Sequence, residues 1–367
     1  MLLTGKKIIG LIITLLLLSF FYLSIPPNKV IIYVAPGGTH LDTAEIYKPK
    51  FAERGLTLVI KKFPDITNIG SHVGKETGEP TIGFSGTAVT SDNLPNVRAA
   101  GVTTIMPMFI FVKSDFSEGR LSGLYGEHVC LPPSQSITTL MALDVLEAYG
   151  VSEENSKISF YSLQDLLAAM KSGECDAGII ILSTDSQIIK DLTSNSTLSI
   201  LDFPDSRAIT TKVENTEEVV IPVGAFDSIN QLPSKNIHLI GVPNTVIFRE
   251  DLDPEIINLL LQTMKESHAS ATMVTKAFEF PKPAQQLLTE DDTVKNFYEN
   301  GLPWSSRVLP FWLSSLVNKY SVVLVFLISI SIALNQAVNY FNWSGYLLRV
   351  MRKRKPEQEQ EQEQERK

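Results

Sequence analysis

The sequence predicts an α/β protein with two lobes and mixed sheets, flanked by a transmembrane helix near each end. Three observations predict it. Apolar β-branched strands alternate with helical patterns, the alternation restarts near residue 128, and two uncharged apolar runs lie near the termini. A chain of 367 residues also exceeds the usual size of one hydrophobic core, so we expect two compact units.

The first α/β unit opens with the apolar run Val30–Val34, which predicts a buried strand. Two glycines follow it, and Leu41–Arg54 then shows a helical pattern. The order is therefore strand, glycine turn and helix. Four further strands are predicted in this unit, at Thr57–Phe63, Thr81–Phe84, Val97–Ala100 and Met106–Val112.

A second unit starts at the short strand His128–Leu131, which is followed by a proline-rich turn and the amphipathic helix Thr138–Tyr149. No internal repeat with a period of roughly 20 to 50 residues is visible, which excludes solenoids and propellers. The remaining predicted elements are the strands Ile158–Tyr161, Asp176–Leu182 and Thr245–Phe248 and the helices Leu163–Lys171 and Pro254–His268.

The run Ile8–Ile25 carries no charge and follows Lys6 and Lys7. Its length suits a bilayer core of ~30 Å, and no small-residue cleavage motif follows it. We therefore expect an uncleaved membrane anchor. A cleaved signal peptide is the alternative.

A second uncharged run, Tyr320–Leu348, has aromatic residues at both borders and a basic cluster behind it. Aromatic belts and an excess of Lys and Arg on the cytoplasmic side are typical of membrane spans. With both termini in the cytoplasm, the residues between the spans are predicted to face the periplasm or cell exterior from the inner membrane. The charged tail, residues 349–367, is predicted to be solvated.

The composition and the residue spacing exclude several functions. Asp and Glu number 40 against 32 Lys and Arg, a net charge of −8, so no nucleic acid is expected as a partner. The five histidines have neither i, i+4 pairing nor metal-ligand spacing to other groups, so we expect no metal or cofactor. Because Gly86 comes one place too early for a G-x-S-x-G turn, we do not expect an enzyme.

The two cysteines, Cys130 and Cys175, are too few for a disulfide scaffold or a zinc site. We favour two half-buried small apolar residues, since the first ends one predicted strand and the second precedes another. A single disulfide in an oxidising compartment is the alternative.

Three turns that follow predicted strands have the composition of an anion site. Glycine lets the backbone approach a ligand closely, and the start of a helix presents unpaired amides with a partial positive charge. Ordinary helix caps and turn glycines explain any one of these turns, but their recurrence in both units favours a binding site. The candidate ligand-binding residues are Gly37, Gly38 and Thr39, Ser85, Gly86 and Thr87, and Ser134, Gln135 and Ser136, with Ser183 and Phe226 as weaker candidates.

Taken in order, the turn Gly37–Thr39 and the segments His128–Thr139, Ala168–Gly178 and Val242–Asp251 resemble the TAXI-type solute receptors of tripartite ATP-independent periplasmic (TRAP) transporters. The block Tyr298–Trp312 is similar to membrane-attached relatives. The resemblance implies a type II periplasmic-binding-protein fold. Its two lobes would close on a small organic anion or amino acid, such as glutamate or a dicarboxylate, and pass it to a membrane permease.

The expected lobe I comprises residues 28–115 and 242–307, and the expected lobe II comprises 116–241. Residues 1–27 are the anchor or signal, and 308–348 the C-terminal membrane segment. The chain departs from the family at His40, where relatives usually carry an aromatic residue. We expect a membrane-tethered solute-binding receptor of a TRAP-type transport system. The alternative is a sensor or scaffold subunit that uses the same fold.

Overall fold

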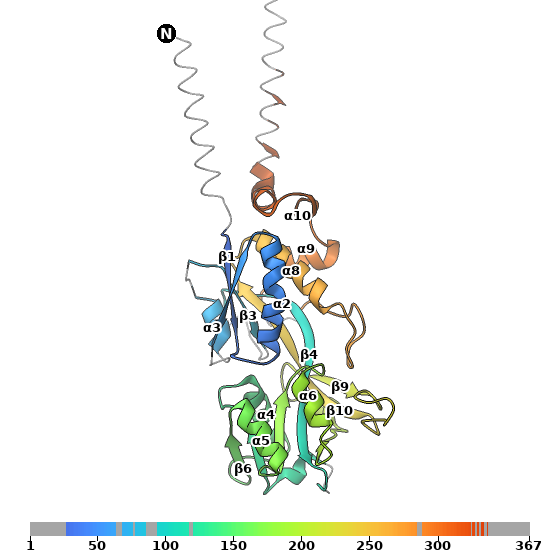
Figure 1. Cartoon of the computed structure of the whole chain (residues 1–367). Coiled ribbons are helices and arrows are strands. Elements are labelled where there is room, and N and C mark those ends of the chain that lie inside the picture. Colours follow the sequence, from blue (N-terminus) through green and yellow to red (C-terminus); the bar gives the residue numbers. More distant parts are fainter. Residues whose placement is uncertain are drawn as a thin grey trace, which may run out of the picture.

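The computed structural model describes residues 27–323 except 64–67, 76–77, 86–93, 117–119 and 285–287, together with scattered residues from 325 to 336. Within this part of the chain, a 10-stranded mixed sheet runs through two lobes, which lie one above the other in Figure 1. The predicted α/β class is confirmed. The separate sheets expected from the sequence are joined into one, in the order β2-β1-β3-β10-β4-β7-β5-β6.

Lobe I, the upper lobe in Figure 1, is built on the parallel strands β1 (Lys29–Val34), β2 (Thr57–Lys62) and β3 (Thr81–Ser85). Successive side chains of β1 enter two cores: Ile32 packs in the core with α2 and α8, and Ile31 packs beside α3. Because both faces are covered, β1 is apolar on both sides. The helices of lobe I are α2 (Thr39–Glu53), α3 (Ile69–Val73), α8 (Pro254–His268), α9 (Asp292–Asn300) and α10 (Trp304–Val308).

Lobe II has a separate hydrophobic core around the parallel strands β5 (His128–Leu131), β6 (Lys157–Phe160) and β7 (Ala177–Ile181). Helices α4 and α5 pack against these strands. The other elements of the lobe are η2 (Leu121–Leu124), α4 (Ile137–Ala148), α5 (Leu163–Ser172), α6 (Gln187–Thr193), β8 (Leu198–Ile200), α7 (Ser206–Ile209) and β9 (Glu217–Ile221).

Two long antiparallel strands, β4 (Val97–Lys113) and β10 (Ile237–Arg249), connect the lobes. The prediction of two separate strands over the range of β4 is wrong, because one strand of 17 residues spans both. Its turn-like middle, residues 101–105, is held in the ladder with β10, a long-range pairing that no local pattern reveals. Since β4 and β10 each place residues in both lobes, the lobe boundaries at 115/116 and 241/242 stay a prediction.

A disulfide joins Cys130 of β5 to Cys175, with the two Cα atoms 5.9 Å apart. The preferred interpretation of two unpaired residues is therefore wrong. Residue Val129 pairs with Ala177 in the parallel ladder between β5 and β7, and this register brings the two thiols together. The bond ties together the strands that form the centre of lobe II.

Within the described residues, none of the helices combines the length and the apolar character needed to cross a bilayer. The expected span Ile8–Ile25 lies outside the described residues, as do most of Tyr320–Leu348 and the tail 349–367. Residues 311–323 are helical and continue the chain beyond α10.

Candidate ligand-binding site

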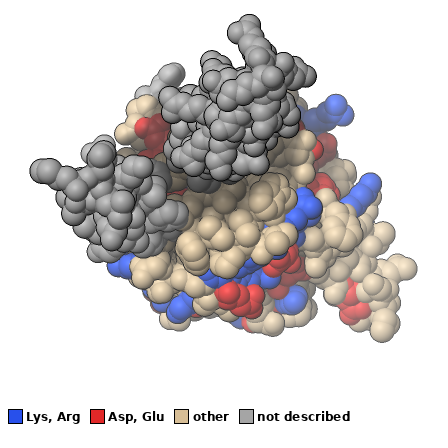
Figure 2. Space-filling view, turned by 90° about the horizontal axis from the view of Figure 1, so that it is seen from above, with Lys and Arg blue, Asp and Glu red and all other residues tan. Residues whose placement is uncertain are grey.

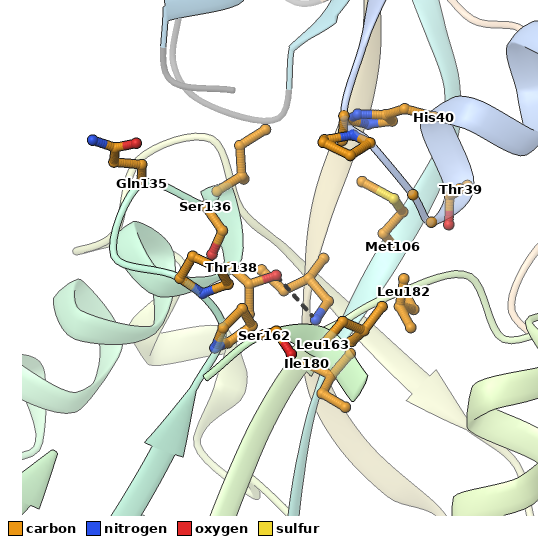
Figure 3. A pocket seen from close by; sticks show the side chains of 18 residues that line it. Thr39, His40, Met106, Gln135, Ser136, Thr138, Ser162, Leu163, Ile180 and Leu182 are labelled. Carbon is orange, nitrogen blue, oxygen red and sulfur yellow. Dashed lines mark hydrogen bonds between the residues drawn. The ribbon is translucent and has the colours of Figure 1, made fainter. Parts of the chain in front are cut away.

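A cavity of about 420 Å³ lies between the lobes. Lobe I contributes the turn between β1 and α2, lobe II contributes the starts of α4 and α5 and the end of β7, and Met106 of β4 lies between them (Figure 3). The lining residues are Ala35, Pro36, Gly37, Gly38, Thr39, His40, Met106, Pro132, Pro133, Gln135, Ser136, Ile137, Thr138, Ser162, Leu163, Ile180, Ile181 and Leu182.

Three helices begin at this cavity. The first amides of a helix have no partner within the helix and carry a partial positive charge. Ser136 Oγ accepts from the Thr139 amide at 3.1 Å at the start of α4, and Ser162 Oγ accepts from the Asp165 amide at 3.2 Å at the start of α5. No side chain caps α2, whose preceding residue is Gly38. The Leu41 amide is bonded instead to the Gly38 carbonyl at 3.1 Å, so α2 has no more free amides than α4 or α5.

Gly38 has φ 80° and ψ −167°, a backbone conformation that only glycine adopts without strain. A Cβ at this position would lie 3.6 Å from Cδ2 of Leu182 in the other lobe. Beside it, the Ser183 amide donates a long hydrogen bond of 3.5 Å to Thr39 Oγ1. The glycine turn is therefore a point where the lobes touch.

His40, in the first turn of α2, lines the cavity and is only 7% exposed. Its ring stacks on Phe84 with a centroid distance of 4.9 Å, and its Nε2 has no hydrogen-bond partner. Burial lowers the pKa of His40 to about 4, and the neighbouring Asn244 side chain, whose Oδ1 is likewise buried without another partner, opposes this shift. The imidazole is therefore neutral at pH 7.

No Lys, Arg, Asp or Glu of the described residues lines the cavity. Its polar side chains are neutral, and some already have partners: Thr138 Oγ1 accepts from the Ile181 amide at 3.4 Å, the bond drawn in Figure 3. The walls are otherwise apolar. Such a cavity provides amide and hydroxyl groups for one polar group of a ligand and apolar contact for the rest.

The structure brings five of the predicted site residues to this cavity, namely Gly37, Gly38, Thr39, Gln135 and Ser136. Ser134 belongs to the same turn as Ser136 but does not line the cavity. Ser183 does not line it either, although its backbone amide donates a hydrogen bond to Oγ1 of the lining residue Thr39. The binding role of these residues stays a prediction.

The four remaining candidates lie away from the cavity or outside the described residues. Ser85 is buried at the end of β3, outside the cavity. Phe226 packs against the core of lobe II and does not line the cavity either. Gly86 and Thr87 lie outside the described residues.

His40, Met106 and Ser162 line the cavity but are not among the residues predicted from the sequence. Ser162 had a local signal, because it caps a helix directly after strand β6, in the same arrangement as the turns already selected. The burial of His40 and the position of Met106 depend on contacts between distant segments, and no local pattern reveals them.

A second cluster, outside the cavity, consists of His128, Cys130 and Cys175, whose potential ligand atoms lie within 4.8 Å of one another. The two sulfur atoms are bonded to each other and are not available as thiolates. His128 Nε2 lies 2.9 Å from Ser159 Oγ. In its disulfide form the cluster does not offer a metal site.

None of the curated protein sequences compared with this chain matches it. Among solved structures, an amino acid ABC transporter substrate-binding protein from Streptococcus pneumoniae bound to L-arginine is 15% identical, with 65% of this chain and 88% of that chain covered and a TM-score of 0.41. The periplasmic aliphatic sulphonate binding protein from Escherichia coli is 13% identical, with 66% and 73% covered and a TM-score of 0.43. Scores of this size establish neither a shared ligand nor a shared partner. The model of the NMT1-like family matches residues 79–289, more than half of the sequence, and the chain therefore belongs to the NMT1-like family.

Proposed function

We propose that this chain is an extracytoplasmic receptor that binds a small organic anion between its lobes. The observation that carries the proposal is the interlobe cavity at which three helices begin. A ligand that contacts both lobes stabilises their closed arrangement by its differential affinity for that arrangement. The two strands β4 and β10 are the connection about which such a closure would take place.

The anion is supported by the character of the polar groups in the cavity. Backbone amides at the start of a helix bind negative groups, and the uncapped start of α2 lies opposite the hydroxyl-bearing starts of α4 and α5. The free amides are donors held in place by the fold, whereas the Ser136 and Ser162 hydroxyls already donate to Thr139 Oγ1 and Asp165 Oδ2. The absence of acidic side chains from the described lining removes repulsion toward an anion.

We also propose that both ends of the chain hold the receptor at the membrane. The start of β1 and the helix over residues 311–323 lie at the same pole of lobe I (Figure 1). Trp304 and Trp312 are 66% and 51% exposed there. The visible surface at the centre of this pole is uncharged, with charged side chains toward its rim (Figure 2). Exposed tryptophan is typical of the membrane interface.

A role in transport is supported by the resemblance to TAXI-type receptors of TRAP systems, in which the bound solute passes to a membrane permease. One observation favours the alternative of a sensor or scaffold subunit. The segment that leads to the C-terminal apolar run touches β4 where it crosses between the lobes. The Val102 amide donates to the Lys282 carbonyl at 2.8 Å, and Tyr298 Oη donates to the Ala100 carbonyl at 3.0 Å. Lobe closure would therefore change the contacts of Lys282 and Tyr298 with β4, and these two residues belong to the segment that leads to the C-terminal apolar run.

Binding is tested with the full chain in nanodiscs, by identifying any copurifying ligand through mass spectrometry and by thermal shift with glutamate, dicarboxylates and monocarboxylates. A ligand at about 100 times its dissociation constant should add ~2.7 kcal/mol to the free energy of unfolding. If no ligand copurifies and no anion raises the unfolding temperature, the receptor proposal is refuted. Copurification with a multi-span protein would support transport, and copurification with a kinase would support sensing.

A further inference from the structure

Three potential metal ligands meet in lobe II, away from the cavity between the lobes. They are a ring nitrogen of His128 and the sulfur atoms of Cys130 and Cys175, and these three atoms lie within 4.8 Å of one another. The two cysteines are 45 residues apart in the sequence, so no local spacing predicts the cluster. The register between β5 and β7 brings them together. One imidazole and two thiolates form a ligand set that is typical of zinc.

The hydrogen bonds of His128 prepare its ring as a metal ligand. Nδ1 lies 3.0 Å from the Glu174 carbonyl oxygen, and because a carbonyl only accepts, Nδ1 carries the proton. Nε2 therefore has a free lone pair, which accepts a hydrogen bond from Ser159 Oγ at 2.9 Å, and it lies 3.7 Å from Cys130 Sγ. Histidines that bind metals commonly donate their other N–H to a carbonyl in this way. The ring thus places a free lone pair beside the sulfur atoms.

The two sulfur atoms are bonded to each other, and only a small separation would let both bind one ion. Two thiolates on a tetrahedral zinc ion, each about 2.3 Å from it, lie roughly 3.8 Å apart. The Cα atoms of Cys130 and Cys175 are 5.9 Å apart, so rotation about the two Cα–Cβ bonds provides this separation without moving the strands. Both cysteines are buried and His128 is half-buried, so an ion would enter from the side of the histidine.

We propose that reduction of the Cys130–Cys175 disulfide converts this cluster into a zinc site, with Cys130 Sγ, Cys175 Sγ and His128 Nε2 as the ligands. The reductant is a dithiol: it supplies two electrons and two protons and becomes a disulfide, while the Cys130–Cys175 bond breaks to give two thiols. Zinc then displaces both thiol protons and binds the neutral imidazole, and water completes the tetrahedron. The ion keeps β5 tied to the segment before β7 when the disulfide is open. The proposal does not depend on the solute-binding function.

The site is tested with Co²⁺ as a spectroscopic probe of the full chain in nanodiscs, with no His tag on the chain or on the scaffold protein. The disulfide is reduced with a phosphine, which is then removed without admitting oxygen. One equivalent of Co²⁺ should give a thiolate-to-cobalt charge-transfer band, and Zn²⁺ should abolish it, because thiolate and imidazole ligands favour zinc. The chain with its disulfide intact should give no band. A reduced chain without the band, or the same band in the oxidised chain, would overturn the proposal.

The role of His128 is tested with one substitution and a matched control. His128→Ala leaves both thiols in place, so the zinc affinity of the reduced chain should fall by more than the roughly 10- to 100-fold that loss of an outer partner of a metal ligand costs. His238→Ala removes another partly exposed histidine, which lies beside Asp202 and outside the cluster, and it should keep the affinity of the unaltered chain. An unchanged affinity in His128→Ala, or an equal loss in His238→Ala, would overturn the assignment of His128.

Two measurements on the unaltered chain do not depend on how the variants fold. X-ray absorption at the zinc edge of the reduced, zinc-loaded chain should show two sulfur ligands at about 2.3 Å and nitrogen or oxygen ligands at about 2.0 Å. Zinc should also raise the urea midpoint of the reduced chain, because a site assembled by the fold binds the folded form preferentially. A zinc shell without two sulfur ligands, or an unchanged midpoint at saturating zinc, would overturn the proposal.

Discussion

Replacing Gly38 by valine separates two roles of this residue, its backbone conformation and its contact with the other lobe. At φ 80° and ψ −167°, a residue with a Cβ is strained by about 1 to 3 kcal/mol, whatever its surroundings. The free energy of unfolding should therefore fall by this amount. Urea unfolding measured by circular dichroism gives that difference directly.

The contact with Leu182 adds a second effect, on affinity. A Cβ at residue 38 would lie 3.6 Å from Leu182 Cδ2, so the two methyl groups of valine reach into that side chain when the lobes are together. Overpacking of this kind costs about 1 to 3 kcal/mol, which corresponds to roughly 5- to 150-fold weaker binding of a ligand that requires the closed lobes. Titration of the anion found in the screen measures it.

Gly55→Val is the matched control for strain. Gly55 has φ +81° with no atom within 4 Å of a Cβ, and it does not line the cavity. The Gly55→Val variant should lose stability but keep the affinity of the unaltered chain for the anion. In a Gly38→Val background, Leu182→Ala should restore part of the binding in a double-mutant cycle. Equal affinities of Gly38→Val and the unaltered chain would refute the placement of this turn at the contact between lobes.

Three further outcomes are expected. Reduction of the Cys130–Cys175 bond, which closes a sequence separation of 45, should lower the free energy of unfolding by about 2 to 4 kcal/mol; the double variant with both cysteines changed to serine should no longer respond to reductant in urea unfolding. Burial lowers the pKa of His268 from 6.5 to about 4, so the unfolded chain takes up a proton that the folded chain excludes, and stability falls as the pH drops between these values. In His268→Gln, the loss of unfolding free energy over this pH range should be smaller by on the order of 2 kcal/mol. Urea midpoints that change with pH in the same way in the variant and in the unaltered chain would contradict this expectation. In nanodiscs of brominated phospholipid, Trp304→Phe and Trp312→Phe should each reduce fluorescence quenching, whereas undiminished quenching in both would argue against a membrane-facing pole.

The glycine turn of the site can be predicted from the sequence because its determinants are local. A β-branched run, two glycines and a helical pattern follow one another, and the structure shows β1, the turn and α2 in that order. The serine turn before α4 is predictable for the same reason, since Ser136 caps the helix that follows it. Strand ends and helix starts then place both turns at one cavity.

Features that depend on distant residues cannot be predicted in this way. The residues 101–105 have a turn-like composition, but the ladder with β10 makes them part of one strand. The disulfide depends on the register between β5 and β7. His40 is the second residue of α2 and has no distinctive neighbours in sequence, and it is buried because Phe84 of β3 stacks on its ring.

The distribution of rigid and irregular contacts also determines how the cavity opens. In lobe II, the Cys130–Cys175 disulfide links β5 to the segment before β7, and the Ile181 amide donates a hydrogen bond to Thr138 Oγ1 at the cavity. By contrast, the ladder of β4 and β10 shifts register after Asn244, where β10 enters lobe I, and again after Val246, where β10 also pairs with β3. Irregular pairing of this kind bends more readily than a regular ladder. We therefore expect the cavity to open by bending of the two crossing strands, with the starts of α4 and α5 moving as one body relative to the start of α2.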